Sequence, residues 1–422
     1  MIPKLLIVFA LNRNNKNSFA ALAGALSGNL PTSEHLVLPV SEEKIEEELE
    51  NLSCAASNVL ICFSFTTFDL LEIAQLIGKI KEKIASGRLE NIVLLAGGSH
   101  STGAPAESLK IGFDYVIAGE GEISFPFFVQ AIASHLDPLS IQGVVAWRGG
   151  KIVHSGLSEK ACLDLFSPFS PQVPLFSPIE ITRGCRQGCH FCQTTFLFGS
   201  HPRHRGIEKI EEVVRHFVQA GRKDIRFVCP DALSYGCSKD GKQDLSAVES
   251  LLRRASLAGA KRLYLGSFPS EIWPGSVTPQ GLEIVRRYCS NNNIVMGVQS
   301  GSPAVLERIH RRHTIEEALA SIRLISDFGF TAKVDFIFGF PGETEREQQE
   351  TAEFMLRIAD QGAVIHSHSF MPLAGTPLSN APPPQITPHL VKILQRLEGS
   401  GKQFGTWEKQ HEVAHRIYEF RR

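Results

Sequence analysis

The chain has 422 residues, more than one hydrophobic core usually organises, so two domains are expected. Its 43 Lys and Arg nearly balance its 44 Asp and Glu, which excludes a polybasic field for binding nucleic acid or an anionic bilayer. There is no uncharged apolar stretch long enough to span a bilayer, and nine cysteines, an odd number, argue against a disulfide framework. These features predict a cytoplasmic protein in reducing surroundings, with no nucleic-acid and no membrane partner.

Residues 1–135 alternate short apolar runs with amphipathic stretches. The runs KLLIVFA, HLVLPV, NVLICFSF, NIVLLAGG and DYVIAGEGE predict five strands joined by helices, the pattern of an α/β domain with a doubly wound, Rossmann-like parallel sheet. Such sheets bind ligands beyond the carboxyl ends of their strands. The loops expected there carry small and polar residues: Asn12, Arg13, Ser64, Thr66, Gly97, Gly98, Ser99, His100, Gly119, Glu120 and Gly121. None of these loops has G-x-G-x-x-G spacing, so a nicotinamide-binding domain is disfavoured.

Residues 136–178 interrupt this alternation. The segment GVVAWRGGKIVHSG predicts a hairpin that turns at Gly149 and Gly150. The segment FSPFSPQVPLFSP carries prolines that exclude a helix or a central strand. We expect a hairpin followed by a linker that wraps between two domains.

From Ile179 the alternation resumes. Strands are expected at IEIT, DIRFVC, KRLYLG, NIVMGV, AKVDFIFG and VIHSHSF, with helices between them. Six strand–helix units are too few for a closed eight-unit barrel, so residues 179–375 predict an open, partial (β/α)6 barrel of the TIM type. Residues 376–422 predict a helical C-terminal extension.

Three cysteines follow the first strand of that barrel in the C-x3-C-x2-C run RGCRQGCHFC: Cys185, Cys189 and Cys192. Gly184 and Gly188 would let this loop curl around a metal centre. A zinc knuckle would need a fourth Cys or His at short spacing, and His190 is confined between two of the cysteines. Three thiolates at this spacing favour an iron–sulfur cluster. The other six cysteines are scattered, mostly among apolar neighbours, and are expected as small buried residues.

With Phe191 as its aromatic residue, the loop resembles the C-x3-C-x-aromatic-C signature of the radical S-adenosylmethionine (SAM) superfamily. The resemblance implies a [4Fe–4S] cluster on the three cysteines, with the fourth iron left open for the amino and carboxylate groups of SAM. An electron from the cluster would then cleave SAM to methionine and a 5′-deoxyadenosyl radical. The protein would supply orientation and exclude water.

Downstream stretches follow the order of that family: LGSFPSE, GVQSGS, HRRHT, VDFIFGFPGET and MPLAGTPL. By resemblance, Gln299 and Ser300 lie near the ribose or methionyl part of SAM, and an Arg of the pair 311–312 lies near its carboxylate. The full set of SAM contacts implied is Phe191, Ser267, Gln299, Ser300, Arg311, Arg312, Asp335 and Gly339. Taken singly, these positions have structural alternatives, since Ser267 also suits a helix cap and Gly339 a turn.

The parallel domain that precedes the cluster loop makes the chain resemble cobalamin-binding radical SAM enzymes as far as about residue 380. Many cobalamin folds bind cobalt through the His of a D-x-H-x-x-G motif after the first strand. Here SHSTG supplies His100 and Gly103 after the fourth strand, and Gly98 stands in place of the Asp. The resemblance therefore implies a base-off corrinoid at the loops named above, with His100 as a loop residue near the corrin and no His on the cobalt.

The resulting expectation is a cobalamin-dependent radical SAM methyltransferase that acts on an unactivated sp3 carbon. The stretches ALNRNNKNSF and FVCPDALSYG further resemble a group of archaeal proteins that includes the glutamine C-methyltransferase of methyl-coenzyme M reductase. This resemblance implies a Gln in a protein or peptide as substrate, besides an external electron donor. Two alternatives stay open: a methylthiotransferase, which should carry a second cysteine triad, and a non-methylating cobalamin-dependent enzyme such as a cyclase.

A rival motif lies near the end of the sequence. HEVAH, residues 411–415, fits the zinc-protease pattern H-E-x-x-H, with His411 and His415 one helical turn apart. Glu419 follows one turn later, but a third ligand on the same straight helix cannot easily close a tetrahedron. We expect a solvated amphipathic helix here and no zinc site.

Overall fold

The computed structural model describes residues 4–29 and 35–422. The chain divides into two compact units. The first ends at Ser177 and also takes in the short segment Leu373–Gly375, while the second holds Pro178–Pro372 and Thr376–Arg422. Among the described residues, no helix combines the length and the apolar character that a bilayer crossing requires.

The first unit is built on a seven-stranded sheet with the order β2-β1-β3-β4-β5-β6-β7. Its strands are β1 (Leu5–Leu11), β2 (His35–Ser41), β3 (Asn58–Ser64), β4 (Ile92–Gly97), β5 (Tyr115–Ile117), β6 (Val144–Arg148) and β7 (Lys151–His154). The first five strands pair in parallel, which confirms the predicted sheet. β1 and β3 are almost wholly buried and apolar, as expected for central strands of a parallel sheet that helices cover on both faces.

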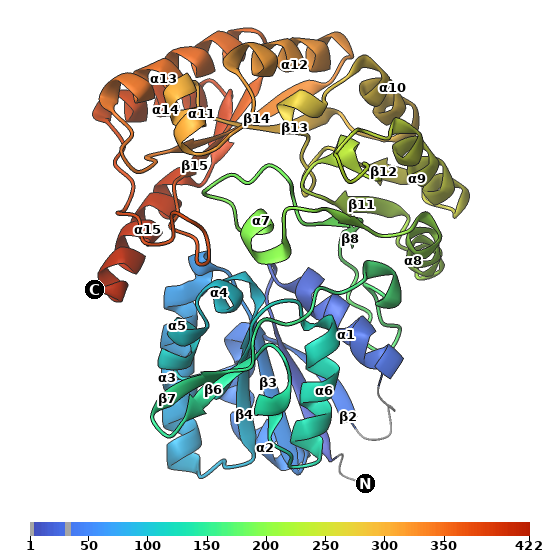
Figure 1. Cartoon of the computed structure of the whole chain (residues 1–422), viewed down its shortest axis with the longest axis vertical. Helices are drawn as coiled ribbons and strands as arrows, with labels where there is room; N and C mark the ends of the chain where they lie inside the picture. Colours follow the sequence, from blue (N-terminus) through green and yellow to red (C-terminus); the bar gives the residue numbers. More distant parts are fainter. Residues whose placement is uncertain (1–3, 30–34) are drawn as a thin grey trace. The chain divides into compact units, whose positions relative to one another are not determined.

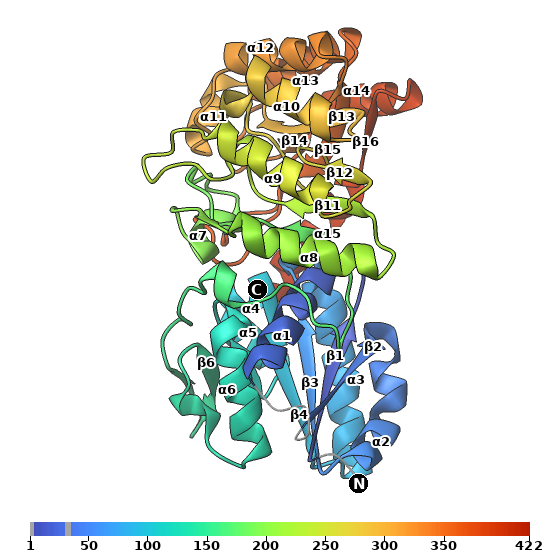
Figure 2. The ribbon, with the colours of Figure 1, turned by 90° about the vertical axis from the view of Figure 1, so that its right-hand side faces the viewer.

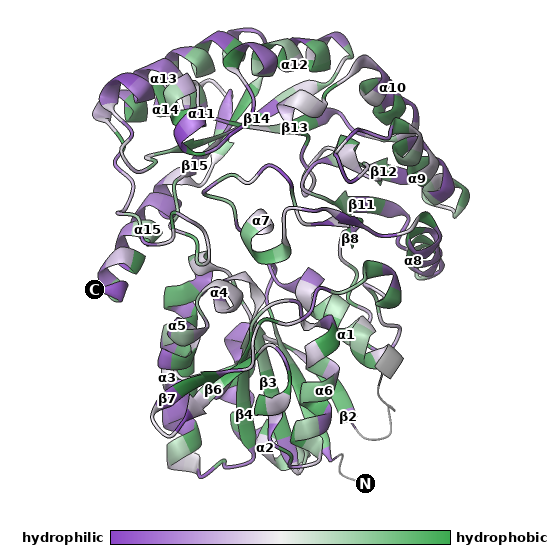
Figure 3. Ribbon diagram, in the orientation of Figure 1, coloured by the Kyte–Doolittle hydropathy of each residue, from purple (hydrophilic) through white to green (hydrophobic). Residues whose placement is uncertain are grey.

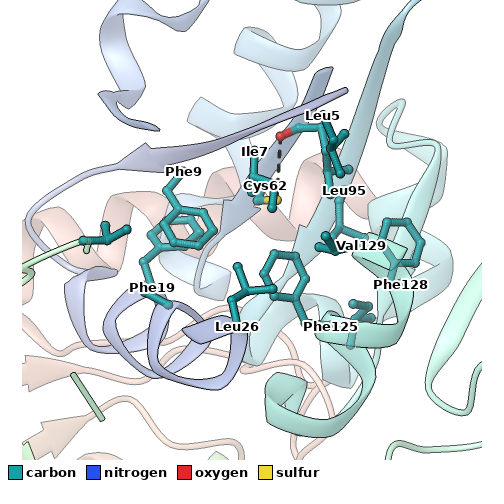
Figure 4. Close-up of a cluster of buried hydrophobic side chains, with 14 of the residues drawn as sticks. Leu5, Ile7, Phe9, Phe19, Leu26, Cys62, Leu95, Phe125, Phe128 and Val129 are labelled. Carbon is teal, nitrogen blue, oxygen red and sulfur yellow. Dashed lines mark hydrogen bonds between the residues drawn. The ribbon is translucent and has the colours of Figure 1, made fainter. Parts of the chain in front are cut away.

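Helices cover both faces of this sheet (Figures 1 and 2). α1 (Lys16–Asn29) packs beside α6 (Gly121–Ala133), and α2 (Ile45–Ala55) packs beside α3 (Leu70–Gly87) on the other face. Figure 4 shows the core on the side of α1 and α6, where β1, β3 and β4 meet these helices through Leu5, Ile7, Phe9, Phe19, Leu26, Cys62, Leu95, Phe125, Phe128 and Val129. The Phe9 and Phe19 rings stack with their centroids 4.5 Å apart.

Gly149 and Gly150 turn the predicted hairpin from β6 to β7, and both have a positive φ. β6 pairs antiparallel with β5, so this hairpin extends the sheet of the first unit. The proline-rich stretch behind it contains the short 3-10 helix η4 (Leu163–Leu165) and returns to α1, where the Ser170 and Ser27 hydroxyls lie 2.7 Å apart. Residues 136–177 therefore pack with the first unit.

The second unit carries parallel strands in two sheets, ordered β12-β11-β8 and β13-β14-β15-β16. Their bounds are β8 (Ile179–Glu180), β11 (Asp224–Val228), β12 (Arg262–Tyr264), β13 (Asn293–Gln299), β14 (Thr331–Phe338), β15 (Val364–Ser369) and β16 (Gln403–Gly405). The Val295 N–H donates to the Gly266 carbonyl, and the Val295 carbonyl accepts the Ile272 N–H. These two hydrogen bonds join β13 to the segment after β12. The result is the predicted open, partial barrel.

Helices of the second unit cover the outside of these strands, with hydrophobic faces turned inward and hydrophilic faces outward (Figure 3). They are α8 (Ile207–Gln219), α9 (Leu245–Leu257), α10 (Pro279–Tyr288), α11 (Pro303–Arg308), α12 (Ile315–Asp327) and α13 (Glu345–Asp360). α12 and α13 both begin with a capping box, Thr314 with Glu317 and Thr344 with Glu347.

The tail forms the two predicted helices, α14 (Pro388–Gly399) and α15 (Trp407–Arg421). Between them β16, which the sequence did not predict, pairs in parallel with β15. A three-residue strand gives no periodic signal of its own, because its pairing partner lies far away in the sequence.

Candidate functional site

The three cysteines of the C-x3-C-x2-C run lie in a loop between β9 (Thr182–Arg183) and α7 (Gln193–Phe198). Gly184 has a φ of +90°, and a Cβ there would lie 2.9 Å from the Gly199 carbonyl oxygen. That carbonyl accepts the Cys185 N–H, and the Thr195 hydroxyl donates to the Cys185 carbonyl at 2.6 Å. Only glycine fits where the loop begins to curl.

Aromatic rings anchor the rest of this loop. His190 stacks on His310 with ring centroids 5.1 Å apart, and the His310 Nδ1 lies 3.0 Å from the Gly188 carbonyl oxygen. Phe191 packs into a small apolar cluster with Phe340, their centroids 5.6 Å apart. The aromatic residue of the signature therefore holds the loop in place.

The three thiols lie close enough to influence one another. Burial, with smaller contributions from the neighbouring Cys192 and Cys189, raises the pKa of Cys185 to about 11. Burial also raises the pKa of Cys192, again with a contribution from Cys189. Buried thiolates that repel one another need a nearby cation in order to stay ionised. The donor set and its burial therefore fit a metal cluster bound by three cysteines.

Polar side chains gather around Gly297 on β13. Arg311 donates one N–H to the Cys189 sulfur at 3.4 Å and another to the Gly297 carbonyl oxygen. A Cβ on Gly297 would lie 2.4 Å from the Gln299 amide nitrogen and 3.2 Å from the Glu271 carboxylate. Glu271 keeps exposed surface, yet the protein around its carboxylate and the charge of Asp335 raise its pKa to about 7. The absence of a side chain at Gly297 leaves room for the side chains of Gln299, Arg311 and Glu271.

Three of the expected SAM contacts carry buried polar atoms that have no hydrogen-bond partner in the described chain. These atoms are the Ser267 Oγ, the Gln299 Oε1 and the Arg311 Nε. Gln299 also has a φ of +79°, unusual for a residue other than glycine. Buried polar atoms are normally paired, so unpaired ones indicate a missing ligand or water. These residues fit a polar ligand that enters the interior of the barrel.

The remaining expected SAM contacts have other surroundings. Ser300 is fully buried, with its hydroxyl 2.9 Å from the Thr351 hydroxyl. A Cβ on Gly339 would lie 2.5 Å from the Pro384 Cβ. Arg312 is exposed, and Asp335 bonds to a histidine on the next strand. The Ser300 side chain and the bare Cα of Gly339 therefore serve packing within the unit.

In the first unit, the residues expected to contact a corrinoid follow the carboxyl ends of β1, β3, β4 and β5. Asn12 follows β1, where its Oδ1 accepts the N–H groups of Asn14 and Asn15, and Arg13 beside it is exposed. Thr66 follows β3, and its hydroxyl lies 2.8 Å from the Asp69 carboxylate. Because these strands are parallel neighbours, their ends share one edge of the sheet.

Gly97 and Gly98 stand at this edge in different surroundings. A Cβ on Gly98, whose φ is +88°, would lie 2.8 Å from the Ser64 hydroxyl and from the Phe65 backbone. A Cβ on Gly97 would meet only the Phe63 carbonyl oxygen, at 3.8 Å. Gly98 therefore lets two strand ends approach, while Gly97 leaves backbone accessible to a ligand.

The segment 98–103 was expected to be a loop, but it forms the short helix α4 (Gly98–Gly103), which contains Ser99 and His100. His100 is fully buried and stacks on Phe65. Its Nδ1 lies 3.2 Å from the Thr67 hydroxyl, which also accepts the Ala374 N–H, and its Nε2 lies 3.2 Å from the Glu107 carboxylate. The ring is enclosed within the unit, with its Nδ1 on Thr67 and its Nε2 beside Glu107, so His100 is a buried helix residue and not the loop residue expected from the sequence.

The turn after β5 also packs inward. Glu120 is buried, and its carboxylate accepts the Ala161 N–H at 3.0 Å. A Cβ on Gly119 would lie 2.9 Å from the Ser158 Cβ, and one on Gly121 would lie 2.8 Å from Leu22. The Glu120 side chain therefore serves packing within the unit, and the two glycines let the turn approach its neighbours closely.

The family model of the Radical SAM superfamily matches residues 179–355. This segment is therefore similar to a radical SAM domain. The matched segment includes the cysteine loop and the strands up to β14, so the resemblance first noted in the cysteine run extends through most of the barrel.

Individual proteins are similar to this chain over parts of their length. A tRNA-2-methylthio-N(6)-dimethylallyladenosine synthase of Finegoldia magna is 31% identical over 197 residues, 46% of this chain and 41% of that protein. The matches span 39 to 49% of the length of the first three curated relatives, less than half of each.

Two solved structures share the fold. The radical S-adenosylmethionine methyltransferase TsrM from Kitasatospora setae aligns with a TM-score of 0.68 at 16% identity, covering 89% of this chain and 74% of that one. The cobalamin-dependent S-adenosylmethionine radical enzyme OxsB aligns with a TM-score of 0.62 at 15% identity, covering 86% and 53%. At this identity the likeness shows the fold alone, a parallel α/β unit followed by a partial barrel.

Sequence reasoning missed several ionisable residues of the second unit. Asp231 and Glu271 follow β11 and β12, and burial raises the pKa of both. His366 and His368 lie on β15, where side chains two apart point to one face. The H-x-H spacing in VIHSHSF was the available signal for this pair.

Glu343 supports a prediction about stability. Its carboxylate accepts the N–H groups of Gly339 and Phe340, yet burial raises its pKa to about 7. A raised carboxyl pKa stabilises the fold below about pH 4.5, and that contribution is lost as the pH rises through 7. We expect Glu343→Gln to make the apoprotein about 3 kcal/mol more stable than the parent at pH 8 and equal to it at pH 4.5.

Urea unfolding of both proteins across this pH range would measure the difference. Glu345→Gln, on the exposed first turn of α13, serves as the control and should change stability by less than about 0.5 kcal/mol. Parallel pH profiles for Glu343→Gln and the parent would contradict the prediction.

The HEVAH motif lies on α15. The His411 and His415 rings are neighbours with centroids 4.6 Å apart, and the His415 Nε2 lies 3.1 Å from the Pro384 carbonyl oxygen. Glu412 is exposed, and among the described residues no further His, Cys, Asp or Glu completes a three-ligand group with this pair. We therefore expect His411→Ala to leave SAM cleavage within about twofold of the parent and zinc content unchanged. One equivalent of zinc that disappears in this variant would restore the protease-like interpretation.

Proposed function

We propose that this chain is a cobalamin-dependent radical SAM methyltransferase. The observation that carries the proposal is the three-cysteine loop at the start of a partial barrel, which follows a parallel α/β unit. Both solved structures that share this order contain cobalamin, and that of TsrM also contains a [4Fe–4S] cluster.

Cys185, Cys189 and Cys192 would hold the [4Fe–4S] cluster, and the unpaired atoms of Ser267, Gln299 and Arg311 would meet SAM. Bound together, these groups supply reductive cleavage of a sulfonium to give a carbon radical. Arg311 has the most direct role among the residues of the chain. It donates to the Cys189 sulfur, and its charge would stabilise a ligand thiolate as well as a SAM carboxylate.

The corrinoid would lie beyond the carboxyl ends of the strands of the first sheet, where Gly97 leaves room for it. Asn12, Arg13 and Thr66 lie in the loops that follow the neighbouring strands. The burial of His100, whose Nδ1 lies on the Thr67 hydroxyl and whose Nε2 lies beside the Glu107 carboxylate, supports cobalt without a histidine ligand from this helix. Methyl transfer from such a corrinoid is the chemistry that this group supplies when bound.

As a finer proposal, the substrate is an unactivated carbon of a protein or peptide, and specifically a Gln of methyl-coenzyme M reductase. Its support is the resemblance of ALNRNNKNSF and FVCPDALSYG to archaeal proteins with that activity. An external electron donor would then reduce the cluster.

A methylthiotransferase is the second candidate, because a synthase of that kind is among the relatives of the barrel. Such an enzyme should carry a second cysteine triad in its first unit. In the described part of that unit, Cys54 and Cys162 are exposed and Cys62 is buried in the core, and they belong to separate elements. The exposure of Cys54 and Cys162 also corrects the expectation that the scattered cysteines are small buried residues.

Mass spectrometry separates the candidates. The reconstituted full-length protein is incubated anaerobically with SAM, a reductant, methylcobalamin and methyl-coenzyme M reductase lacking the modification. Addition of one methyl group to a Gln-containing peptide supports the whole proposal, and addition of a methylthio group overturns it. If the protein cleaved SAM but bound no corrinoid, the assignment of radical SAM chemistry would stand and the methyltransferase proposal would be wrong.

A further inference from the structure

Two histidines and one aspartate face each other across adjacent strands of the radical SAM domain. Asp335 on β14 is directly opposite His366 on β15, and His368 is two residues further along the same strand. Side chains two apart on a strand, and side chains directly opposite on its neighbour, lie on one face of a sheet. The three side chains therefore form a cluster that the strand pairing fixes.

The spacing of their ligand atoms matches a metal site. The His366 Nδ1 lies 2.8 Å from the Asp335 Oδ1 and 3.2 Å from the His368 Nε2, and one ligand atom of each residue lies within 4.8 Å of those of the other two. Around a divalent metal with bonds of about 2.1 Å, neighbouring ligand atoms are about 3.0 to 3.4 Å apart. The two contacts fall close to this range.

Hydrogen bonding alone does not satisfy the cluster well. The His366 Nδ1 faces both a carboxylate oxygen and a second imidazole nitrogen. One proton on that nitrogen can point at only one of them, and without it the lone pair would face the carboxylate. A cation between the three atoms would interact favourably with all of them at once.

Neighbouring side chains hold the rings in place. The His366 ring stacks on Phe404 of β16, with centroids 4.3 Å apart and planes 6° apart. The Gln410 side chain lies 3.3 Å from the His368 Nδ1 and accepts the Ser369 N–H. Such outer partners orient metal-binding imidazoles. The His366 side chain retains 24% of its exposed surface, which leaves access from solvent.

We propose that Asp335, His366 and His368 bind one divalent first-row transition metal, with open coordination positions for an oxygen or nitrogen donor of the substrate. Two imidazoles and one carboxylate on one side of a metal leave such positions free. The metal would polarise or orient a carbonyl or amide of the substrate. This site is additional to the cysteine cluster, and it gives Asp335 a role other than the SAM contact expected from the sequence.

Cobalt(II) provides a direct test, because its visible absorption reports on nitrogen and oxygen ligands. The full-length chain with Cys185→Ala, Cys189→Ala and Cys192→Ala is titrated, so that no cluster thiolate competes for the ion. We expect one equivalent to bind. His366→Phe, which can keep the stack on Phe404, and His368→Phe should each weaken binding by at least about 100-fold, and Asp335→Asn by at least about tenfold.

His389→Phe is the matched control, because this exposed histidine on α14 lies outside the cluster, and it should bind cobalt like the parent. Circular dichroism of each variant checks the fold. Unchanged cobalt affinity in a folded His366→Phe, His368→Phe double variant would falsify the inference, as would a parent that binds no cobalt. Loss of binding only in a His411→Ala, His415→Ala variant would also overturn it, by moving the ion to α15. The titration requires neither the cluster nor methyl transfer, so its result does not depend on whether the proposed function is correct.

Discussion

Replacing Cys185, Cys189 and Cys192 together by Ala is expected to remove the iron–sulfur absorbance and reduce SAM cleavage to background. The three thiols come from one loop that Gly184, Thr195 and Phe191 hold in a fixed curl, and in the proposed function each thiol would contribute one ligand. Losing an outer partner of a metal site already costs roughly 10- to 100-fold, so losing all the ligands should cost more. Iron analysis, visible spectra and methionine release with dithionite measure the outcome.

A variant with Cys54→Ala and Cys162→Ala controls for the loss of thiols in general. Both residues are exposed and lie outside the radical SAM domain, so this variant should keep its iron and its SAM cleavage. A triple variant of the cluster loop that still released 5′-deoxyadenosine would show that the loop does not hold the reactive cluster.

The alternation of apolar runs and amphipathic helices predicted the parallel strands of both units well, because that pattern reflects burial within each element. β1 is apolar from Leu5 to Ala10 since helices cover both of its faces, and α8 has a strongly one-sided distribution of apolar residues. The cysteine loop was predictable for a related reason: its ligands and its two glycines are local in the sequence.

Features that depend on distant contacts were not predictable in this way. The β6–β7 hairpin was recognised, but its pairing with β5 depends on a neighbour that the hairpin sequence does not specify. The site shows the same limit, because Asp335 and His366 are 31 residues apart and meet through strand register. His100 was assigned to a ligand loop on its residue type, whereas Thr67 and Glu107 bind its ring inside the unit.

Gly97→Leu is expected to weaken corrinoid binding at least about tenfold while leaving the fold and the cluster intact. Gly97 has an extended backbone, with a φ of −148°, that any residue can adopt, and a Cβ would meet only the Phe63 carbonyl oxygen at 3.8 Å. The new side chain would therefore occupy the ligand side of the β4 end without disturbing the sheet. We expect affinity for hydroxocobalamin to fall at least about tenfold, which corresponds to about 1.4 kcal/mol. Corrinoid absorbance retained after gel filtration measures this.

Gly98→Ala separates ligand blocking from damage to the fold. Its φ of +88° and the 2.8 Å approach of Ser64 and Phe65 predict a loss of about 1 to 3 kcal/mol in stability, together with weaker corrinoid binding. Gly78→Leu, on an exposed turn of α3 with open space around it, should leave corrinoid binding unchanged and should not lower stability, because leucine favours a helix over glycine. If Gly97→Leu bound cobalamin as tightly as Gly78→Leu, the corrinoid would not lie at this edge. The proposal places no histidine on the cobalt, since the nitrogens of His100 lie beside Thr67 and Glu107 within the unit. A nitrogen hyperfine splitting from histidine in the cobalt(II) electron paramagnetic resonance spectrum of the parent would therefore refute it.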